Sequence, residues 1–476
     1  MMAEQALWTP QDLVAATNGR IDGNVTQVLT GITIDSRAAK AGEIFVAIKG
    51  ERHDGHDFVA AALKAGAGLA MVSRATEEMR AAGPLLVVAE DPLRGLENIG
   101  RAARARSHAQ IIGVTGSVGK TSTKEMLRAA LSASGETHAS AASFNNHWGV
   151  PLTLARMPLE AAFGVFEIGM NHAGEITPLV GMVRPHVAIV TTIAASHLGH
   201  FNSLDEIADA KAEIFTGVVP GGIAVINRDT PYFNRLSTAA RATGIGRIVS
   251  FGKHAEADVR IERAVLHPDC CCITANVMGE TLIYKLGLPG EHMAVNSLAV
   301  LAAAKLTGAD LARAALALAT AEPAKGRGVR EELATPDGSL LLIDESYNAN
   351  PASMRAALAL LANAKPGKNG RRIAVLGDML ELGTTGPELH ADLAGPVDEA
   401  GVDVLYAAGP LMANLWGRIP SAKRGAYGET STAITEAVLG GLRVGDVVMV
   451  KGSLGSRMGP LAEAMRHKFP PVRKES

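Results

Sequence analysis

The segment TGSVGKTS, Thr115 to Ser122, decides the fold of the chain around it. It follows the apolar run Ile111 to Val114 and leads into a helical pattern from Thr123 to Ala133. A strand, a glycine-rich turn and a helix together form a phosphate cradle, because the backbone N–H groups of the turn point at phosphate oxygens. The segment therefore predicts an α/β unit that binds a nucleoside triphosphate.

The spacing of the glycines and the lysine within this segment indicates which type of phosphate loop it forms. A common phosphate loop has the form G-x-x-x-x-G-K-[ST], whose first glycine would fall on Val114, so the loop here is the shorter G-x-x-G-K-T. Gly116 and Gly119 allow the backbone to turn toward the phosphates. Lys120 can reach the terminal phosphates, and the hydroxyl of Thr121 can hold a magnesium ion. A plain glycine turn before a helix is the structural alternative, but it would require neither the lysine nor the hydroxyl.

Length and composition bound the class of protein. The 476 residues allow about three domains that each bury a core. A net charge of -2, with the positive residues dispersed, argues against the basic surface of a nucleic-acid binder. Met1 to Pro10 do not resemble a signal peptide and no apolar stretch could span a bilayer, so we expect a cytoplasmic protein without a membrane span. The contiguous Cys270, Cys271 and Cys272 lack the spacing of a zinc site and are interpreted as strand residues.

Alternating apolar runs and helical patterns predict three α/β domains. Residues 1–107 form a small N-terminal α/β domain in this interpretation, residues 108–323 a central domain, and residues 324–476 a Rossmann-like C-terminal domain. The central domain is expected to be a doubly wound parallel sheet of the P-loop ATPase type, with strands at Ile111 to Val114, Gly164 to Ile168, Val187 to Ile193 and Gly222 to Asn227. Extended segments between Asp258 and Leu288 predict an antiparallel edge to that sheet.

Two side chains downstream of the phosphate loop are candidate metal ligands. Glu167 ends a predicted strand in FEIGMNHAGEI, and His197 follows another in IAASHLGHF. Ligands bind at the carboxyl ends of strands in an open α/β sheet, so both could converge on a metal near the triphosphate. The structural alternatives are a helix-capping acid and an ordinary loop histidine.

Lys211 is a further candidate, on the amphipathic segment Leu204 to Phe215. It could be a solvated helix lysine. If it faced magnesium instead, its ammonium at ~4 Å from a divalent ion would cost roughly 8 kcal/mol at an effective dielectric constant of 20. Reaction of the neutral amine with carbon dioxide would convert Lys211 into an anionic carbamate, which could bind magnesium.

Several segments together resemble one enzyme family. They are TGSVGKTS, NNHWGVPLTL (Asn145 to Leu154), FEIGMNHAGEI, SHLGHF, AKAEIF (Ala210 to Phe215), GEHMAVN (Gly290 to Asn296), DESYNANP (Asp344 to Pro351), LGDMLELG (Leu376 to Gly383) and KGSLGSRM (Lys451 to Met458). This set resembles the Mur ligases of bacterial cell-wall synthesis, from DSR at Asp35 to Arg37 through to the last helix. SYNANP and LGDMLELG resemble the branch that adds a dipeptide.

The resemblance implies an ATP-dependent carboxylate–amine ligase that adds D-alanyl-D-alanine to a UDP-N-acetylmuramoyl-tripeptide. The acceptor carboxylate would take the γ-phosphoryl group of ATP, and the dipeptide amine would attack the resulting acyl phosphate. Positioning and charge neutralisation would supply most of the acceleration. ATP, two magnesium ions and a monomeric protein are implied.

The resemblance also implies roles for particular residues of this chain. Lys120, Glu167, His197 and Lys211 would be catalytic, and magnesium would be held by Thr121, Glu167, His197 and carbamylated Lys211. ATP would be bound by Thr115, Gly116, Ser117, Val118, Gly119, Lys120, Thr121, Ser122, Asn146 (together with Asn145), His292, Asn296, Arg327 and Asp344. The UDP-linked substrate would contact Ser36, Arg37, Lys49, Asp54 and His56, and the dipeptide would contact Asn348, Asn350, Lys451 and Ser453.

The chain departs from the family pattern at two places, and other functions remain open. Met293 stands where the family usually has asparagine, and Asp344 is followed by Glu345 where the family has two aspartates. A sister ligase with another amine or acceptor, such as an amino-acid-adding Mur ligase or a folylpolyglutamate synthase, is the first alternative. A nucleotide-dependent switch is the second, although a switch would not need a second metal site.

Overall fold

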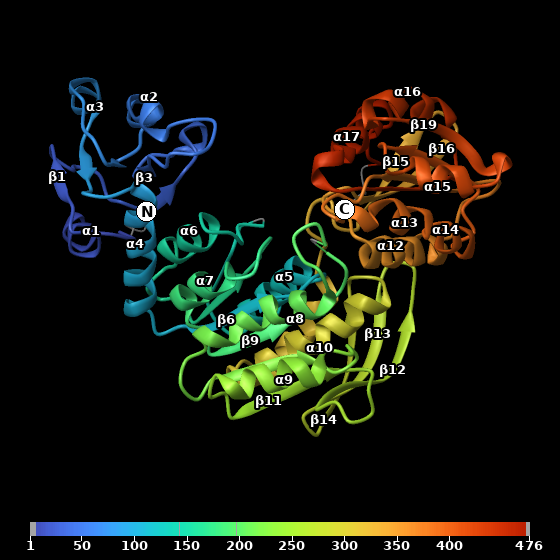
Figure 1. Ribbon diagram of the computed structural model, residues 1–476, viewed down its shortest axis with the longest axis horizontal. Coiled ribbons are helices and arrows are strands. Elements are labelled where there is room, and N and C mark those ends of the chain that lie inside the picture. The colour runs from blue at the N-terminus through green and yellow to red at the C-terminus, as the bar shows by residue number, and fades with distance from the viewer. Residues whose placement is uncertain (1–5, 142, 197, 473–476) are drawn as a thin grey trace.

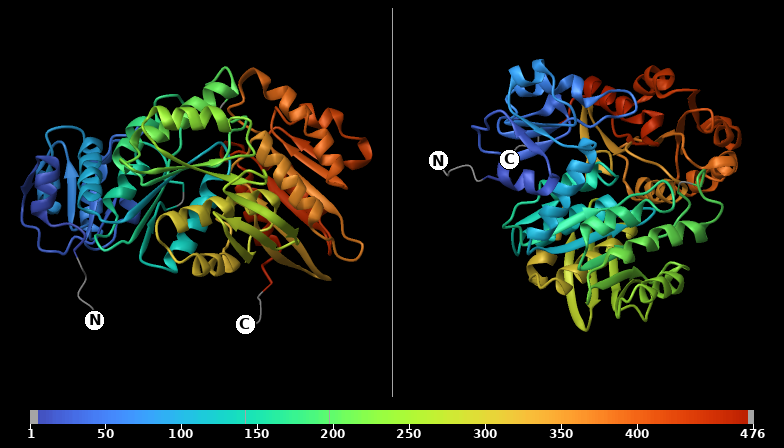
Figure 2. Two further views of the ribbon diagram at one scale, coloured as in Figure 1. Left: turned by 90° about the horizontal axis from the view of Figure 1, so that it is seen from below. Right: turned by 60° about the vertical axis from the view of Figure 1, so that its left-hand side comes forward.

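The computed structural model describes residues 6–141, 143–196 and 198–472. Three α/β domains follow one another along the chain, and the middle domain lies between the other two (Figures 1 and 2). Each domain is built on its own sheet. The predicted fold class, a three-domain α/β protein, is confirmed.

The N-terminal sheet is mostly parallel. Its strand order is β1-β5-β4-β3-β2, and β1 runs antiparallel to β5. The strands are β1 (Arg20–Asp22), β2 (Gly31–Thr33), β3 (Glu43–Val46), β4 (Leu69–Val72) and β5 (Leu85–Val87), and the helices are α1 (Pro10–Thr17), α2 (Val59–Lys64), α3 (Glu77–Ala82) and α4 (Pro92–Arg106). The long helix α4 leads down from this domain to the central one (Figure 1).

The central sheet has the order β14-β13-β12-β11-β10-β9-β6-β8-β7. Its parallel part contains β6 (Gln110–Thr115), β7 (Thr137–Ala139), β8 (Phe163–Glu167), β9 (Val187–Val190), β10 (Ile223–Asn227) and β11 (Arg247–Gly252). The expected antiparallel edge consists of β12 (Val259–Leu266), β13 (Cys271–Val277) and β14 (Glu280–Leu286), and β12 joins β11 in parallel. Cys271 and Cys272 lie in β13, as their interpretation as strand residues required, but Cys270 precedes the strand, so the interpretation was wrong for that residue.

Helices cover both faces of the central sheet because successive strand residues point to opposite sides. In β6, Ile112 and Val114 pack on one face and Ile111 on the other. The first face is covered by α5 (Lys120–Ser132), α10 (Glu291–Leu306) and α11 (Leu311–Ala317). The second is covered by α6 (Gly149–Ala155), α7 (Ile176–Val183), α8 (Leu204–Ala212) and α9 (Phe233–Ala242). The sheet is therefore doubly wound, as predicted.

The C-terminal sheet has the order β15-β16-β20-β17-β18-β19. Its strands are β15 (Val329–Thr335), β16 (Gly338–Glu345), β17 (Arg372–Gly377), β18 (Val404–Ala408), β19 (Arg424–Gly428) and β20 (Val447–Lys451). Only the β15–β16 pair is antiparallel within the described residues. The helices are α12 (Pro351–Asn363), α13 (Gly386–Ala391), α14 (Ala394–Glu399), α15 (Ala413–Arg418), α16 (Ser431–Gly441) and α17 (Met458–Lys468). This arrangement is the expected Rossmann-like unit.

Polar contacts join the central domain to both of its neighbours. Arg104 of α4 donates from Nε to the carbonyl of Val183 at 2.8 Å, which ties the N-terminal domain to the end of α7. On the other side, the N–H of Gly199 donates to the carbonyl of Glu381 at 2.8 Å. Among the described residues, no helix is both long and apolar enough to cross a membrane.

Candidate active site

The phosphate loop has the geometry that its sequence predicts. Gly116 and Gly119 adopt φ values of 146° and 88°, which favour glycine over other residues. A Cβ atom on Gly116 would lie 1.9 Å from Oγ1 of Thr191, so the strand beside the loop leaves no room for a side chain there. Lys120 is the first residue of α5, and its Nζ donates to the carbonyl of Gly116 at 2.8 Å. The loop is thus closed by its own lysine.

Glu167 lies at the carboxyl end of β8 with only 1 % of its surface exposed. Its Oε2 accepts a hydrogen bond from the Thr121 hydroxyl at 2.8 Å, and its Oε1 accepts one from Nδ2 of Asn145 at 2.7 Å. The neighbouring Asn146 has a different contact: its Oδ1 accepts from the N–H groups of Trp148 and Gly149 at the start of α6. Asn145, rather than Asn146, therefore has its side chain against the metal-ligand candidate.

Lys211 is buried, with 1 % of its surface exposed. Its place in α8 explains this, because Ile207 lies one turn earlier on the same face and packs into the core. Burial lowers the pKa of Lys211 well below its usual value, and repulsion by Lys120 lowers it further. Within the described part of the chain, Lys211 has neither a hydrogen bond nor an ion pair through its side chain. The alternative of a solvated helix lysine is therefore wrong.

Burial also lowers the pKa of Lys120, although Glu167 opposes the shift and Arg327 adds to it. The predicted ligand His197 lies outside the described residues. The described residues hold no group of three or more His, Cys, Asp or Glu side chains that could bind a metal ion. What they do hold is a pair of hard oxygen donors from two different elements, Thr121 Oγ1 and Glu167 Oε2, 2.8 Å apart. Such a pair fits one magnesium ion, which prefers oxygen ligands.

A cavity of about 370 Å³ opens above the phosphate loop, between the central and C-terminal domains. We call it the nucleotide cavity. Of the residues with a predicted role, those that line it are Ser117, Val118, Gly119, Lys120, Thr121, Ser122, Asn145, Glu167, His292, Arg327, Asn348, Asn350 and Lys451. The cavity therefore joins predicted ATP and dipeptide residues with two of the predicted metal ligands, Thr121 and Glu167, whereas Lys211 is not on its lining. Asn296 is not on its lining, but its Nδ2 would lie 2.5 Å from a Cβ atom on Gly119.

The C-terminal wall of the nucleotide cavity carries a buried ion pair. Nζ of Lys451 lies 3.2 Å from Oε2 of Glu345 and donates to the carbonyl of Asn348 at 3.0 Å. His292 faces this pair from the central domain, and burial lowers its pKa, with Glu345 opposing the shift and Lys451 adding to it. At neutral pH, His292 is therefore a neutral imidazole beside the Lys451–Glu345 ion pair.

Arg327 is the cation that the C-terminal domain presents to the phosphate side. Its guanidinium lies over the ring of Tyr347, 4.5 Å from the centroid, and its Nη2 is 3.5 Å from Oγ of Ser143 in the central domain. Stacking on the tyrosine holds the planar guanidinium in place without neutralising it. Arg327 can therefore meet an anion that binds at the phosphate loop.

Asp344 has its carboxylate engaged away from the nucleotide cavity. Arg466 donates to Oδ2 at 2.8 Å, and the hydroxyl of Ser346 donates to Oδ1 at 2.6 Å. Asp344 is not among the cavity-lining residues, whereas its neighbour Glu345 is. The predicted contact of Asp344 with ribose stays a prediction, and the structure offers Glu345 as the acid on the cavity side.

Asn350 and Ser453 hold loops of the C-terminal domain in place. Oδ1 of Asn350 accepts from the N–H of Ser353 and so caps α12. Ser453 donates to the carbonyl of Ala349 at 3.3 Å and accepts from the N–H of Leu380 at 2.9 Å. Ser453 thereby joins the SYNANP, LGDMLELG and KGS segments.

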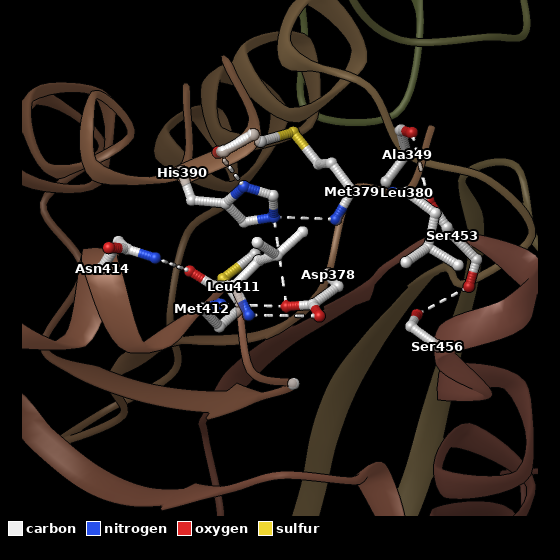
Figure 3. A network of polar contacts seen from close by, with 12 residues as sticks. Ala349, Asp378, Met379, Leu380, His390, Leu411, Met412, Asn414, Ser453 and Ser456 are labelled. Carbon is white, nitrogen blue, oxygen red and sulfur yellow. Dashed lines mark hydrogen bonds and ion pairs between the residues drawn. The ribbon is translucent and has the colours of Figure 1, made fainter. Parts of the chain in front are cut away.

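A buried network fixes the LGDMLELG segment (Figure 3). Asp378 accepts from the N–H groups of Leu411 and Met412 at 3.3 and 2.9 Å. His390 of α13 accepts at Nε2 from the N–H of Met379 at 2.9 Å, and its Nδ1 donates to the carbonyl of Gly386 at 2.6 Å. These two contacts require a neutral imidazole with its proton on Nδ1.

We expect the buried His390 to make the fold sensitive to acid. Burial lowers its pKa, so below the ordinary value of about 6.5 the unfolded chain binds a proton that the folded chain does not. Stability is therefore lost as the pH falls through and below that value. In His390→Gln, the fall of the urea midpoint between about pH 7.5 and about pH 5.5 should be smaller, while stability at the higher pH drops by about 1 kcal/mol through lost hydrogen bonding.

The exposed His467 of α17 supplies the control. His467→Gln should leave the pH dependence of the urea midpoint as in the unsubstituted protein. An unchanged pH dependence in His390→Gln would show that His390 is not held neutral by the fold.

The N-terminal candidates lie outside the cavity. His56 is buried: its Nδ1 lies 2.7 Å from Oδ1 of Asp54, and its Nε2 accepts from the N–H of Ser73 at 3.0 Å. Contacts with His56 and Arg74 hold the pKa of Asp54 below its usual value. The backbones of Lys49 and Asp54 form an isolated antiparallel β-bridge. Arg37, by contrast, is exposed and pairs with Asp35 at 2.8 Å, next to Ser36.

Several cavity residues were not assigned from the sequence. Those with polar side chains include Ser143, Asn171, Glu345, Tyr347 and Glu381. Glu345 and Tyr347 belong to DESYNANP, and Glu381 belongs to LGDMLELG, so these segments carried the signal even though the individual residues had no role. Ser143 had no signal in the sequence.

Three successive parts of the chain match known domains of the Mur ligases. Residues 28–111 match the Mur ligase family, catalytic domain; residues 114–304 match the Mur ligase middle domain; and residues 330–454 match the Mur ligase, glutamate ligase domain. The UDP-N-acetylmuramoyl-tripeptide–D-alanyl-D-alanine ligase of Escherichia coli is 36% identical over 84% of this chain and 86% of its own length. The ligase of the same name from Rickettsia prowazekii is 30% identical over 96% of this chain and 99% of its own length.

Solved structures of MurF ligases are also similar to this chain. A crystal structure of MurF from Acinetobacter baumannii superimposes with a TM-score of 0.82 at 32% identity, covering 96% of this chain and 99% of that one. MurF ligase from Thermotoga maritima, solved in complex with ADP, has a TM-score of 0.75 at 25% identity and covers 92% of this chain and 97% of that one.

Proposed function

Because this chain belongs to the Mur ligase family, and within it to the MurF type, we infer that it is an ATP-dependent ligase that adds D-alanyl-D-alanine to UDP-N-acetylmuramoyl-tripeptide. The observation that carries this function is the nucleotide cavity, where the phosphate loop of one domain faces the buried Lys451–Glu345 pair of the next. A phosphoryl donor and an amine can meet there, as the reaction requires.

We propose that the reaction proceeds through an acyl phosphate. A carboxylate oxygen of the acceptor attacks the γ-phosphorus of ATP, and the bond to ADP breaks. The dipeptide amine then attacks the acyl carbon, loses a proton, and inorganic phosphate leaves. Neither step needs a covalent bond to the protein, so orientation and charge stabilisation are the tasks of the side chains.

At the phosphate loop, Lys120 of the central domain and Arg327 of the C-terminal domain neutralise the charge that develops on the transferred phosphoryl group. Backbone N–H groups between Gly116 and Ser122 bind the phosphates at the N-terminus of α5. Asn145 orients the Glu167 carboxylate through its 2.7 Å hydrogen bond. His292 and Asn296 are proposed for the adenine side, and Asp344 for the ribose side.

The oxygen pair of Thr121 and Glu167 would hold one magnesium ion, and His197 with a carbamate on Lys211 would hold a second. Magnesium bound there would neutralise phosphate charge and bring the acceptor carboxylate beside the γ-phosphate. Lys211 fits the carbamate because burial favours its neutral amine, which is the form that reacts with carbon dioxide.

The remaining assignments place the two other substrates. The charged Glu345–Lys451 pair, with Asn348 and Asn350, is proposed to meet the ammonium and carboxylate of the dipeptide, and Ser453 holds that loop. The UDP end is proposed for the N-terminal domain, at Ser36, Arg37, Lys49 and the Asp54–His56 turn. We further propose domain boundaries at 107 and 323, a monomeric state and a cytoplasmic location.

The test measures phosphate release from ATP and magnesium with the UDP-muramoyl tripeptide, with and without D-alanyl-D-alanine, and follows the product by mass. Sustained release only with all substrates, together with a UDP-muramoyl pentapeptide, is the expected result. Turnover with another amine or acceptor instead would identify a sister ligase. Nucleotide binding without turnover for any pair would indicate a switch.

A further inference from the structure

A second cavity, of about 470 Å³, lies beside the nucleotide cavity. We call it the acceptor cavity. The two cavities share the wall residues Asn145, Gly169, Met170 and Asn171. Asn145 is the residue that contacts Glu167, so the shared wall lies at the proposed place of phosphoryl transfer.

This position limits what the acceptor cavity can bind. The acceptor carboxylate must reach the γ-phosphate at the shared wall, and the side chain of the same amino acid branches from the adjacent carbon. That side chain must therefore extend from the shared wall into a cavity that the nucleotide does not occupy. The acceptor cavity is such a space, and helix α4 of the N-terminal domain forms one side of it.

The walls of the acceptor cavity are apolar in one part and charged in another. Pro178, Leu179 and Met182 of α7, with Met170, offer apolar contacts to methylene groups. Helix α4 and the start of α7 supply the charges. A long side chain with a polar end suits this combination.

The charges on α4 favour an anion. Arg94 lies 3.0 Å and Arg101 lies 3.5 Å from the same oxygen of Glu97, so the three groups carry one net positive charge. The side chains of Arg94 and Arg101 are 63% and 47% exposed, and each retains donors that Glu97 does not use. A carboxylate can bind the planar guanidinium group of an arginine through two hydrogen bonds, whereas that group would repel an ammonium.

Glu175, at the N-terminus of α7, offers the opposite charge to the same cavity. Its Oε2 accepts from the N–H of Asn171 at 2.7 Å. Within the described residues its Oε1 has no hydrogen bond, so that oxygen can accept from a ligand amino group. The acceptor cavity thus presents a cationic site and an anionic site from two different helices.

We propose that this cavity binds the side chain of the third residue of the acceptor peptide, and that Arg94, Arg101 and Glu175 select a side chain ending in both a carboxylate and an amino group. The proposal rests on the proposed function. A diamino dicarboxylic acid, such as the 2,6-diaminopimelate named for an A. baumannii relative, has this chemistry, and lysine lacks the carboxylate. Lysine could place its ammonium at Glu175, but it has no carboxylate for the two arginines, which keep a net positive charge beside Glu97.

A carboxylate for the arginines could also come from the glutamyl residue that the name of that relative includes. The glutamyl carboxylate is present whether the third residue is a diamino dicarboxylic acid or lysine. Comparing the two tripeptides therefore separates the two sources.

The experiment measures pentapeptide formation with UDP-muramoyl tripeptides ending in diaminopimelate and in lysine. The double variant R94Q/R101Q should raise KM for the diaminopimelate peptide on the order of tenfold or more, because charge-assisted hydrogen bonds are lost. KM for the lysine peptide should change less than about threefold, and kcat should be nearly unchanged for both. Arg80→Gln, which breaks an ion pair with Asp22 elsewhere in the N-terminal domain, is the matched control and should change neither.

A second variant, Glu175→Gln, keeps the shape of the site and should raise KM for the diaminopimelate peptide, because it removes the charged acceptor for the amino group. Unchanged thermal unfolding and unchanged ATP binding would show that the variants fold. An equal rise of KM for both peptides would assign the arginines to the glutamyl carboxylate and overturn the proposal, as would a preference of the unsubstituted protein for lysine. Failure of the proposed function would look different, because the unsubstituted protein would then turn over neither peptide.

Discussion

Lys120→Met should lower kcat/KM for ATP by about 10³-fold, because it removes the charge that is aimed at the transferred phosphoryl group. The structure holds the Lys120 amine against the carbonyl of Gly116, at the mouth of the loop where the terminal phosphates are proposed to bind. Preorganised charge of this kind stabilises the transition state without a reorganisation of solvent. Methionine keeps the length of the side chain and removes only its charge. Steady-state phosphate release with all three substrates measures the effect.

Two further measurements make the role of Lys120 specific. ADP lacks the γ-phosphate, so its affinity should fall less than that of ATP when both are titrated into the variant. Lys365→Ala, which removes an exposed lysine of the C-terminal domain, should leave both affinities and kcat/KM unchanged. A loss smaller than tenfold in Lys120→Met would exclude Lys120 from phosphoryl transfer.

The elements that build the site could be predicted from the sequence because their signals are local. The loop from Gly116 to Gly119 needs glycine for its backbone angles, and the flanking strand and helix have different hydrophobic periods. The structure places β6 and α5 where these signals predict them. The parallel strands then bring the carboxyl ends of β6 and β8 to one edge, which explains why Thr121 and Glu167 meet.

Which member of an adjacent pair faces the substrate could not be predicted. Asp344 and Glu345 are neighbours at the end of β16, and neighbouring strand residues point to opposite sides. The structure directs Asp344 toward Arg466 and Glu345 toward Lys451. The choice depends on the register of β16 within the sheet, to which Arg466 of a distant helix contributes, and the motif does not contain that information.

Contacts between domains also could not be predicted from the sequence. The arginines of α4 carry no motif, and only the docking of the N-terminal domain on the central one brings them beside Glu175. The burial of Lys211 was different, because its spacing from Ile207 was visible. One apolar residue four positions earlier placed Lys211 on the core side of the helix, and the charges around it obscured this.

Lys211→Met should abolish most of the activity and yet stabilise the fold. We expect kcat to fall by about 10³-fold, because the variant can form no carbamate and loses a proposed magnesium ligand. The stability of the fold should change in the opposite direction. Burial lowers the pKa of Lys211, so at neutral pH the unfolded chain binds a proton that the folded chain resists. Removing the amine removes this penalty, and the urea midpoint of the variant should rise.

The opposite signs of these two effects separate a carbamate ligand from a merely structural lysine. A structural lysine would lose stability and activity together when it is replaced by methionine. For the unsubstituted protein, removal of carbon dioxide from the assay should lower kcat, and bicarbonate should restore it, while Lys211→Met should respond to neither. An unmodified amine in the intact mass of the nucleotide-bound protein, together with activity indifferent to carbon dioxide, would overturn the carbamate.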